Sequence, residues 1–199
     1  MDSIKKDYIK KKDEISSRLE NFRFIKKEDV YYELLFCLLT PQSNAKKCWQ
    51  AVEQIKKAHL TKDNLINILK TKTRFHNNKS RYILETKNSW GSLKDKLNSN
   101  LPTKELRNWI SENIKGLGLK EASHFLRNIG KSNNQIAILD RHILRNLKKY
   151  SLIKEEKIKS KKDYLEIEEK FLNFSRKVGI PADHLDLFFW SRENGEIFK

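Results

Sequence analysis

Residues 114–130 read IKGLGLKEASHFLRNIG, in which two closely spaced glycines are followed directly by a run of helix-forming residues. Apolar residues recur at helical spacing on both sides of this pair of glycines. Gly116 and Gly118 suit a tight turn, because glycine adopts positive φ and permits close backbone approach. The stretch therefore predicts two helices joined by a hairpin turn over residues 103–130.

Helical spacing of apolar residues extends over nearly the whole chain, whereas the alternation typical of strands is rare. We expect about ten helices and no sheet. The predicted fold is all-α, with two helical lobes that flank a groove and form one unit over residues 1–199. Ser43 is expected to cap the helix that follows Pro41. Gly91 is expected to end a helix that begins near residue 80, and Pro102 to open the next helix.

The composition favours a polyanionic partner. Lys and Arg total 42 against 26 Asp and Glu, a net charge of +16, so nucleic acid is the first candidate and a merely lysine-rich surface the alternative. The only cysteines, Cys37 and Cys48, cannot build a four-cysteine iron–sulfur cluster or a disulfide framework. The sequence lacks the apolar core of a signal peptide and the roughly 18-residue apolar run of a membrane span. We therefore expect an intracellular, soluble protein.

Lys120 has an unusual position for a surface lysine. It lies in the first turn of the second hairpin helix, where the helix dipole disfavours a cation and favours the neutral amine. Backbone N–H groups around Gly116 and Gly118 are expected to bind a DNA phosphate without reading any base. A neutral amine near bound DNA is suited to attack C1′ of a nucleotide and form a Schiff base. A solvated lysine at an ordinary helical corner is the alternative.

Asp140 is the second candidate. It stands in AILDRHIL, residues 137–144, at the head of another apolar helix. An aspartate at this position caps a helix by accepting hydrogen bonds from backbone N–H groups. Its charge is also suited to stabilise a positive charge on the sugar as a base departs, or to help move a proton from Lys120. The two roles do not exclude each other.

These two segments carry a family resemblance. IKGLGLKEASHFLRNIG followed by AILDRHIL resembles the helix-hairpin-helix and Gly/Pro-Asp loop of the base-excision DNA glycosylases. Within that superfamily, KEASHFLRN and LDRHILR resemble the type-2 8-oxoguanine DNA glycosylase/AP lyases. The resemblance is strongest over residues 112–147 and extends more loosely to ELLFCLLT, RFHNNKSRYI and LDLFFWSRENGEIFK. It implies that Lys120 is the nucleophile and that Asp140 assists it.

The resemblance also implies residues that read the flipped base by stacking and hydrogen bonding. Lys199 corresponds to the final lysine that such enzymes use to tell 8-oxoguanine from guanine, and it supplies both an ammonium and the terminal carboxylate. Trp190 corresponds to a tryptophan of the same terminal helix. Phe75 belongs to an Arg-Phe pair that borders the base pocket. A frayed tail for Lys199 and core packing for Trp190 are the alternatives.

Four further residues near these segments have less specific roles. Asp186, one helical turn from Trp190, is a candidate acceptor for a purine edge, with a surface or capping role as the alternative. Gln42 departs from the type-2 pattern but corresponds to a glutamine that in other glycosylases lies near the lesion or the opposite strand. His76 replaces an aromatic residue of the family, and His124 lies one turn beyond Lys120, where core packing is the simpler role.

The sequence leaves three functions in competition. The first is a bifunctional enzyme that excises 8-oxoguanine from double-stranded DNA and nicks the strand by β-elimination. The second is an endonuclease III-like glycosylase for oxidised pyrimidines, although those enzymes usually carry the four-cysteine cluster. The third is a non-catalytic helix-hairpin-helix protein, which requires the glycines but neither Lys120 nor Asp140. The resemblance implies no metal or organic cofactor, allows a monovalent cation at the hairpin carbonyls, and suggests a monomer without an obligate protein partner.

Overall fold

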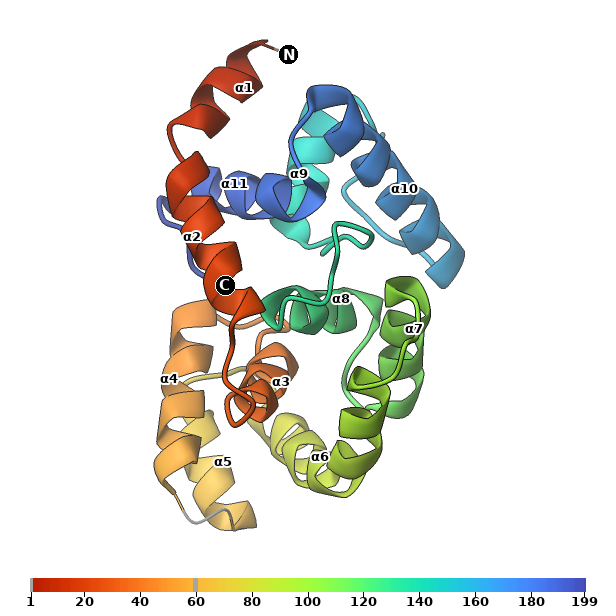
Figure 1. Ribbon diagram of the computed structural model, residues 1–199. Coiled ribbons are helices and arrows are strands. Elements are labelled where there is room, and N and C mark those ends of the chain that lie inside the picture. Colours follow the sequence, from red (N-terminus) through yellow and green to blue (C-terminus); the bar gives the residue numbers. More distant parts are fainter. Residues whose placement is uncertain (1, 59–60) are drawn as a thin grey trace. The chain divides into compact units, whose positions relative to one another are not determined.

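The computed structural model describes residues 2–58 and 61–199 (Figure 1). These residues form eleven helices and no strand, which confirms the predicted all-α fold. The helices are α1 (Asp2–Ile9), α2 (Lys12–Arg23), α3 (Val30–Leu39), α4 (Ala45–Lys57), α5 (Lys62–Lys70), α6 (His76–Leu97), α7 (Thr103–Asn113), α8 (Leu119–Asn128), α9 (Arg141–Lys149), α10 (Lys161–Val178) and α11 (Ala182–Asn194).

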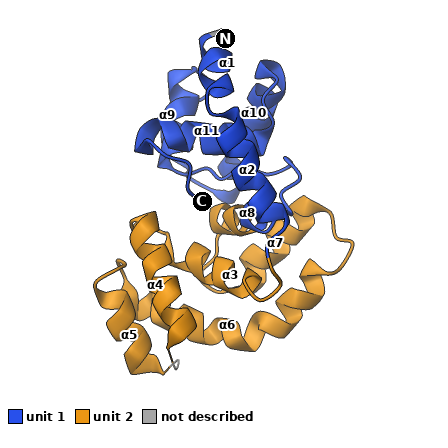
Figure 2. Ribbon diagram, turned by 60° about the vertical axis from the view of Figure 1, so that its left-hand side comes forward, with its two compact units in different colours: residues 1–25, 126–199 blue, residues 26–125 orange. Residues whose placement is uncertain are grey.

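The chain divides into two compact units (Figure 2). Unit 1 comprises residues 1–25 and 126–199, and unit 2 comprises residues 26–125. The boundary at residue 125 falls inside α8. The first turn of α8, including Lys120, therefore belongs to unit 2, whereas Asp140 belongs to unit 1.

Each unit is built around one helix that is buried on nearly all sides. In unit 2 this helix is α3, whose residues 34–39 are all buried and which packs against α4 and α6. In unit 1 it is α11, whose residues 185–189 are all buried and which packs against α2, α9 and α10. A helix that is apolar around its whole circumference requires such a central position.

The hairpin of unit 2 has the predicted form of helix, tight turn and helix. Gly116 has φ of +93°, and a Cβ at this position would lie 2.5 Å from Tyr82 Cδ2 and 3.0 Å from Leu38 Cδ2. The turn is therefore pressed against α6 and α3 and has no room for a side chain. The fully buried Arg107 of α7 donates a hydrogen bond from Nη1 to Ser123 Oγ of α8 at 3.4 Å, which ties the two helices together.

Two expected joints differ from the structure. Gly91 does not end a helix, because α6 continues through it to Leu97; the buried side chains of Leu93 and Leu97 continue the apolar face and outweigh the roughly 1 kcal/mol cost of an internal glycine. Ser43 does not cap α4. Asn44 does so instead, by accepting a hydrogen bond from the Lys47 N–H.

Pro102 opens α7 as expected, although it occupies the position just before the first helical residue. Among residues 2–58 and 61–199, no helix has the length and apolar character that crossing a membrane requires.

Two glycines of unit 1 offer a matched test of packing. Gly130 (φ +69°) and Gly179 (φ +66°) end α8 and α10 with the same pair of backbone hydrogen bonds, those of a Schellman motif. A Cβ at Gly130 would lie 2.6 Å from Arg23 Cα, whereas a Cβ at Gly179 would meet nothing within 4 Å.

We expect Gly130→Ala to lower the free energy of unfolding by at least about 1 kcal/mol more than Gly179→Ala, because only the first adds overpacking to the backbone strain. Urea unfolding of both variants measures the difference. Equal losses would mean that the chain around Arg23 moves aside without cost.

Candidate active site

Lys120 is the second residue of α8, and its side chain is about one quarter exposed. Its Nζ lies 2.8 Å from Glu121 Oε1 in an ion pair. The ammonium must lose this partner, or pass its proton on, before the amine can act as a nucleophile. One turn further along α8, His124 is buried and packs its ring edge-on against Phe36, with centroids 5.5 Å apart.

Glu121 also occupies the anion site that the sequence predicts at the hairpin. Its Oε2 accepts a hydrogen bond of 3.3 Å from the Gly118 N–H, as the acidic residue of a capping box does. The same carboxylate therefore binds both the backbone donor and the candidate nucleophile. The φ of Gly118 is not in the left-handed region, so of the two turn glycines only Gly116 needs glycine for its backbone conformation.

Gln42 and Phe75 lie in unit 2 at two different turns, and both have left-handed backbones, with φ of +54° and +56°. Gln42 is exposed between α3 and α4. Phe75 directly precedes α6 and is 52% exposed, with the Arg74 guanidinium 5.5 Å from its ring centroid. His76 follows as the first residue of α6. Exposed side chains on strained backbone are typical of sites that contact a ligand.

Asp140 caps α9 in unit 1, as its sequence position predicts. Its Oδ1 accepts hydrogen bonds from the N–H groups of His142 and Ile143 at 2.8 and 2.9 Å. The other carboxylate oxygen, Oδ2, makes no hydrogen bond to any residue that the structure describes. The cap thus fixes the carboxylate and leaves one oxygen available for chemistry.

The segment before Asp140 is buried and non-helical, so its backbone polar groups need partners from elsewhere. Helix α10 supplies them to Ala137. Glu168 Oε1 accepts from the Ala137 N–H at 2.9 Å, and the Tyr164 hydroxyl donates to the Ala137 carbonyl at 2.7 Å. These two bonds hold the chain that leads into Asp140.

Asp186 is buried in α11 of unit 1, and its Oδ2 lies 3.1 Å from Arg127 Nη1. Poor alignment keeps this ion pair from being a hydrogen bond, since Arg127 Nε and Nη1 find no acceptor among the described residues. Burial raises the pKa of the Asp186 carboxyl to about 7; Arg127 opposes this rise, while Asp140 and Asp183 add to it. The carboxyl is therefore easier to protonate than a solvated one, and it gains a donor when it is protonated.

The last residues of unit 1 pack within that unit. Ile197 is buried, and the ring of Phe198 lies tilted against Trp190 with centroids 6.5 Å apart. Trp190 and Lys199 are both partly exposed. Trp190 therefore combines a packing contact with an accessible surface, and Lys199 follows an anchored segment.

Unit 2 thus holds Lys120, Gly116, Gly118, Gln42 and Phe75, and unit 1 holds Asp140, Asp186, Trp190 and Lys199. Sequence reasoning missed three charged residues that contact or organise these candidates: Glu121, Arg127 and Lys79. The G-x-x-E spacing from Gly118 to Glu121 is a recognisable capping signal. Arg127 and Lys79 have no local signal, because their partners are distant in the sequence.

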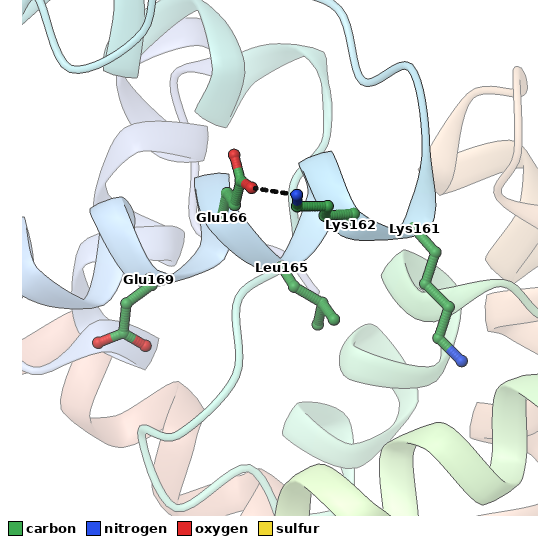
Figure 3. A pocket seen from close by; sticks show the side chains of 5 residues that line it. All are labelled: Lys161, Lys162, Leu165, Glu166 and Glu169. Atoms are coloured by element: carbon green, nitrogen blue, oxygen red, sulfur yellow. Dashed lines mark ion pairs between the residues drawn. The ribbon is translucent and has the colours of Figure 1, made fainter.

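A surface pocket lies elsewhere, on α10 in unit 1 (Figure 3). It is lined by Lys161, Lys162, Leu165, Glu166 and Glu169 and contains none of the candidate residues. Among the residues that the structure describes, no three His, Cys, Asp or Glu side chains are grouped so that they could hold a metal ion.

A family model, known sequences and solved structures that resemble this chain all point to one family. A family model for 8-oxoguanine DNA glycosylase matches residues 15–180. An 8-oxoguanine DNA glycosylase/AP lyase of Fusobacterium nucleatum is 46% identical, over 98% of this chain and 96% of that protein.

Two solved structures are also similar. The 8-oxoguanine DNA glycosylase of Thermotoga maritima has a TM-score of 0.89 and 32% identity, over 100% of this chain and 97% of that chain. The 8-oxoguanine glycosylase/lyase of Methanocaldococcus jannaschii, in complex with a 15mer DNA containing 8-oxoguanine, has a TM-score of 0.88 and 34% identity over 100% of both chains. The chain therefore belongs to the 8-oxoguanine DNA glycosylase family.

Proposed function

We propose that this protein is a bifunctional 8-oxoguanine DNA glycosylase/AP lyase, and that residues 1–199 act as a single helix-hairpin-helix glycosylase. The observation that carries the proposal is Lys120 in the first turn of α8, directly after the Gly116–Gly118 turn. The near full-length similarity to proteins named for this activity supports it.

Lys120 is the nucleophile of the proposed reaction. Its neutral amine attacks C1′ of the damaged nucleotide, the bond from C1′ to N9 breaks, and the base leaves with the bonding electrons and takes up a proton. Opening of the sugar ring gives a Schiff base between Nζ and C1′. Loss of a proton from C2′ then expels the 3′ phosphate by β-elimination, and the strand is nicked 3′ to the lesion.

Asp140 stabilises the positive charge that develops on the sugar as the base departs. The cap on α9 supports this role, because it fixes Oδ1 and leaves Oδ2 without a hydrogen bond among the described residues. A carboxylate held in this way needs no rearrangement at the moment of reaction, which is how preorganised groups lower a barrier.

The base is read by Lys199, Trp190, Phe75, Asp186 and Gln42, and the hairpin around Gly116 and Gly118 binds a phosphate of the same DNA. The accessible surfaces of Phe75 and Trp190 support stacking on the flipped base. Asp186 offers acceptor oxygens to a purine edge, and its raised pKa favours a carboxyl that can also donate. The substrate is double-stranded DNA, bound by a monomer in the prokaryotic cytoplasm, at the nucleoid.

We expect Lys120→Gln to abolish the covalent adduct that borohydride traps on duplex DNA with one 8-oxoguanine, since glutamine cannot form a Schiff base. Lys115→Gln is the matched control, because Lys115 belongs to the same hairpin and is largely exposed. With protein in excess over DNA, so that a weaker contact to the phosphate does not lower occupancy, Lys115→Gln should trap as the wild type does.

Undamaged and thymine-glycol duplexes, run in parallel, separate the competing functions. A stronger adduct with thymine glycol would favour the endonuclease III-like activity. Tight binding without any adduct would leave a non-catalytic DNA-binding protein. An adduct that persists in Lys120→Gln would contradict the assignment of the nucleophile.

We expect Asp140→Asn to slow base excision by at least about a hundredfold, because the amide retains the cap but loses the charge. Its stability should remain within about 0.5 kcal/mol of the wild type. Asp140→Ala should be equally slow and also lose about 1 kcal/mol of stability with the cap. Single-turnover excision and urea unfolding measure the two effects. Normal excision by Asp140→Asn would reduce Asp140 to a helix cap.

A further inference from the structure

We propose that Lys79 is a positioning residue for lesion recognition, whose ammonium holds the two turns that present Gln42 and Phe75. The proposal rests on the proposed function, in which these two residues contact the damaged base. Lys79 itself lies in the first turn of α6 and is 4% exposed, so it acts through its neighbours and not on DNA.

The Lys79 ammonium is fully used in hydrogen bonds. Its Nζ donates to the Leu39 carbonyl at 2.7 Å, to the Pro41 carbonyl at 2.8 Å and to Ser43 Oγ at 2.9 Å. An ammonium has three N–H donors, so all are satisfied. Within the described part of the chain it forms no ion pair, and its charge is stabilised by carbonyl dipoles at the C-terminus of α3.

The bond to Pro41 controls the conformation of Gln42. The Ser43 N–H donates to the Thr40 carbonyl at 3.0 Å, Pro41 is the second residue of this turn, and Gln42 is the third with φ of +54°. These are the features of a type II turn, which normally places glycine where Gln42 stands. Type II and type I turns differ by a flip of the central peptide. The carbonyl of that peptide belongs to Pro41, so Lys79 holds it in the type II orientation.

The same network also reaches the residue before Phe75, through Ser43. Ser43 Oγ, which Lys79 binds, also accepts a hydrogen bond of 2.9 Å from the Arg74 N–H. On the other side of Phe75, the Lys79 backbone N–H donates to the Phe75 carbonyl at 3.0 Å. Of these two bonds, the one from Arg74 to Ser43 depends on the Lys79 ammonium, and the other is the backbone bond that begins α6.

The left-handed backbones of Gln42 and Phe75 lower the stability of the fold, and neither side chain is well buried. A non-glycine residue in the left-handed region costs on the order of 1 kcal/mol or more, and burying a lysine without a carboxylate is also expensive. Gln42 is exposed and Phe75 is 52% exposed, so their side chains recover little of this cost by packing. The cost of holding two strained residues toward solvent is offset if their side chains contact the damaged base when DNA is bound.

Lys79 also has an electrostatic neighbour in Lys120. Burial lowers the pKa of Lys79 to about 8, with further lowering by the charges of Lys120 and Arg74, while Cys48 and Glu121 oppose the shift. The Cys48 thiol is itself neutral near pH 7, because burial raises its pKa to about 11. Removing the Lys79 charge can therefore also change the reaction electrostatically, by acting on Lys120. An experiment has to separate this effect from the positioning of Gln42 and Phe75.

Two substrates separate these two effects for Lys79→Met, in which methionine fills a similar volume without donors. On duplex DNA with 8-oxoguanine we expect single-turnover excision to fall roughly ten- to a hundredfold, because misplaced contacts to the base weaken orientation. On a duplex with a preformed abasic site, which has no base to read, cleavage should stay close to the wild-type rate. Leu65→Ala is the matched control: it destabilises the core of unit 2 through α5 and should affect neither reaction when the protein is folded.

A milder variant and a double-mutant cycle test the same role in case Lys79→Met does not fold. Ser43→Ala removes the bridge between the two turns and should lower excision in the same selective way. The effect of Lys79→Met on excision should shrink in a Gln42→Ala background, because coupled residues are non-additive. Equal losses on both substrates, or additive effects with Gln42→Ala, would overturn the positioning role. A wild-type protein that cleaves the abasic site but leaves 8-oxoguanine intact would instead contradict the proposed function.

Discussion

A steric constraint at Gly116 positions the start of α8. A side chain there would collide with Tyr82 of α6 and Leu38 of α3, so the hairpin turn lies directly against the central helix of unit 2 and against α6, which packs on that helix. The same two helices border the turns that carry Gln42 and Phe75. Lys120 and these two residues are therefore placed by one packed core, and a disturbance of α3 or α6 reaches all of them.

Unit 1 places its candidates by satisfying buried polar groups. Glu168 and Tyr164 support the backbone before Asp140, the α9 cap orients its carboxylate, and Arg127 offsets part of the charge of Asp186. Such groups are costly to bury without partners, so each bond also specifies the conformation of its neighbours. Burial raises the pKa of the Asp186 carboxyl, and the nearby carboxylates of Asp140 and Asp183 raise it further.

Sequence patterns predicted what depends on local signals and missed what depends on tertiary contacts. The helical periodicity, the hairpin around Gly116 and the cap at Asp140 all follow from residues within a few positions of each other. The prediction that a helix ends at Gly91 is wrong, because the packing of Leu93 and Leu97 outweighs the weak helix propensity of glycine. The role of Lys79 could not be predicted from the sequence for a related reason. Its hydrogen-bond acceptors lie 36 to 40 residues away, and no local pattern indicates contacts at that separation.

The carboxylate of Glu121 has a consequence for the energetics of DNA binding. A phosphate that binds the Gly118 N–H has to displace Glu121, which is an anion already attached to the protein. Binding of DNA normally gains entropy when Lys and Arg side chains neutralise phosphates and release the cations condensed on them, and that gain makes affinity fall steeply with salt. The Gly118 N–H carries no net charge, so a phosphate that replaces Glu121 there is not neutralised by it and releases no condensed cation through this contact. This contact therefore adds little to the salt dependence, while the exchange separates Lys120 from the carboxylate that holds its ammonium.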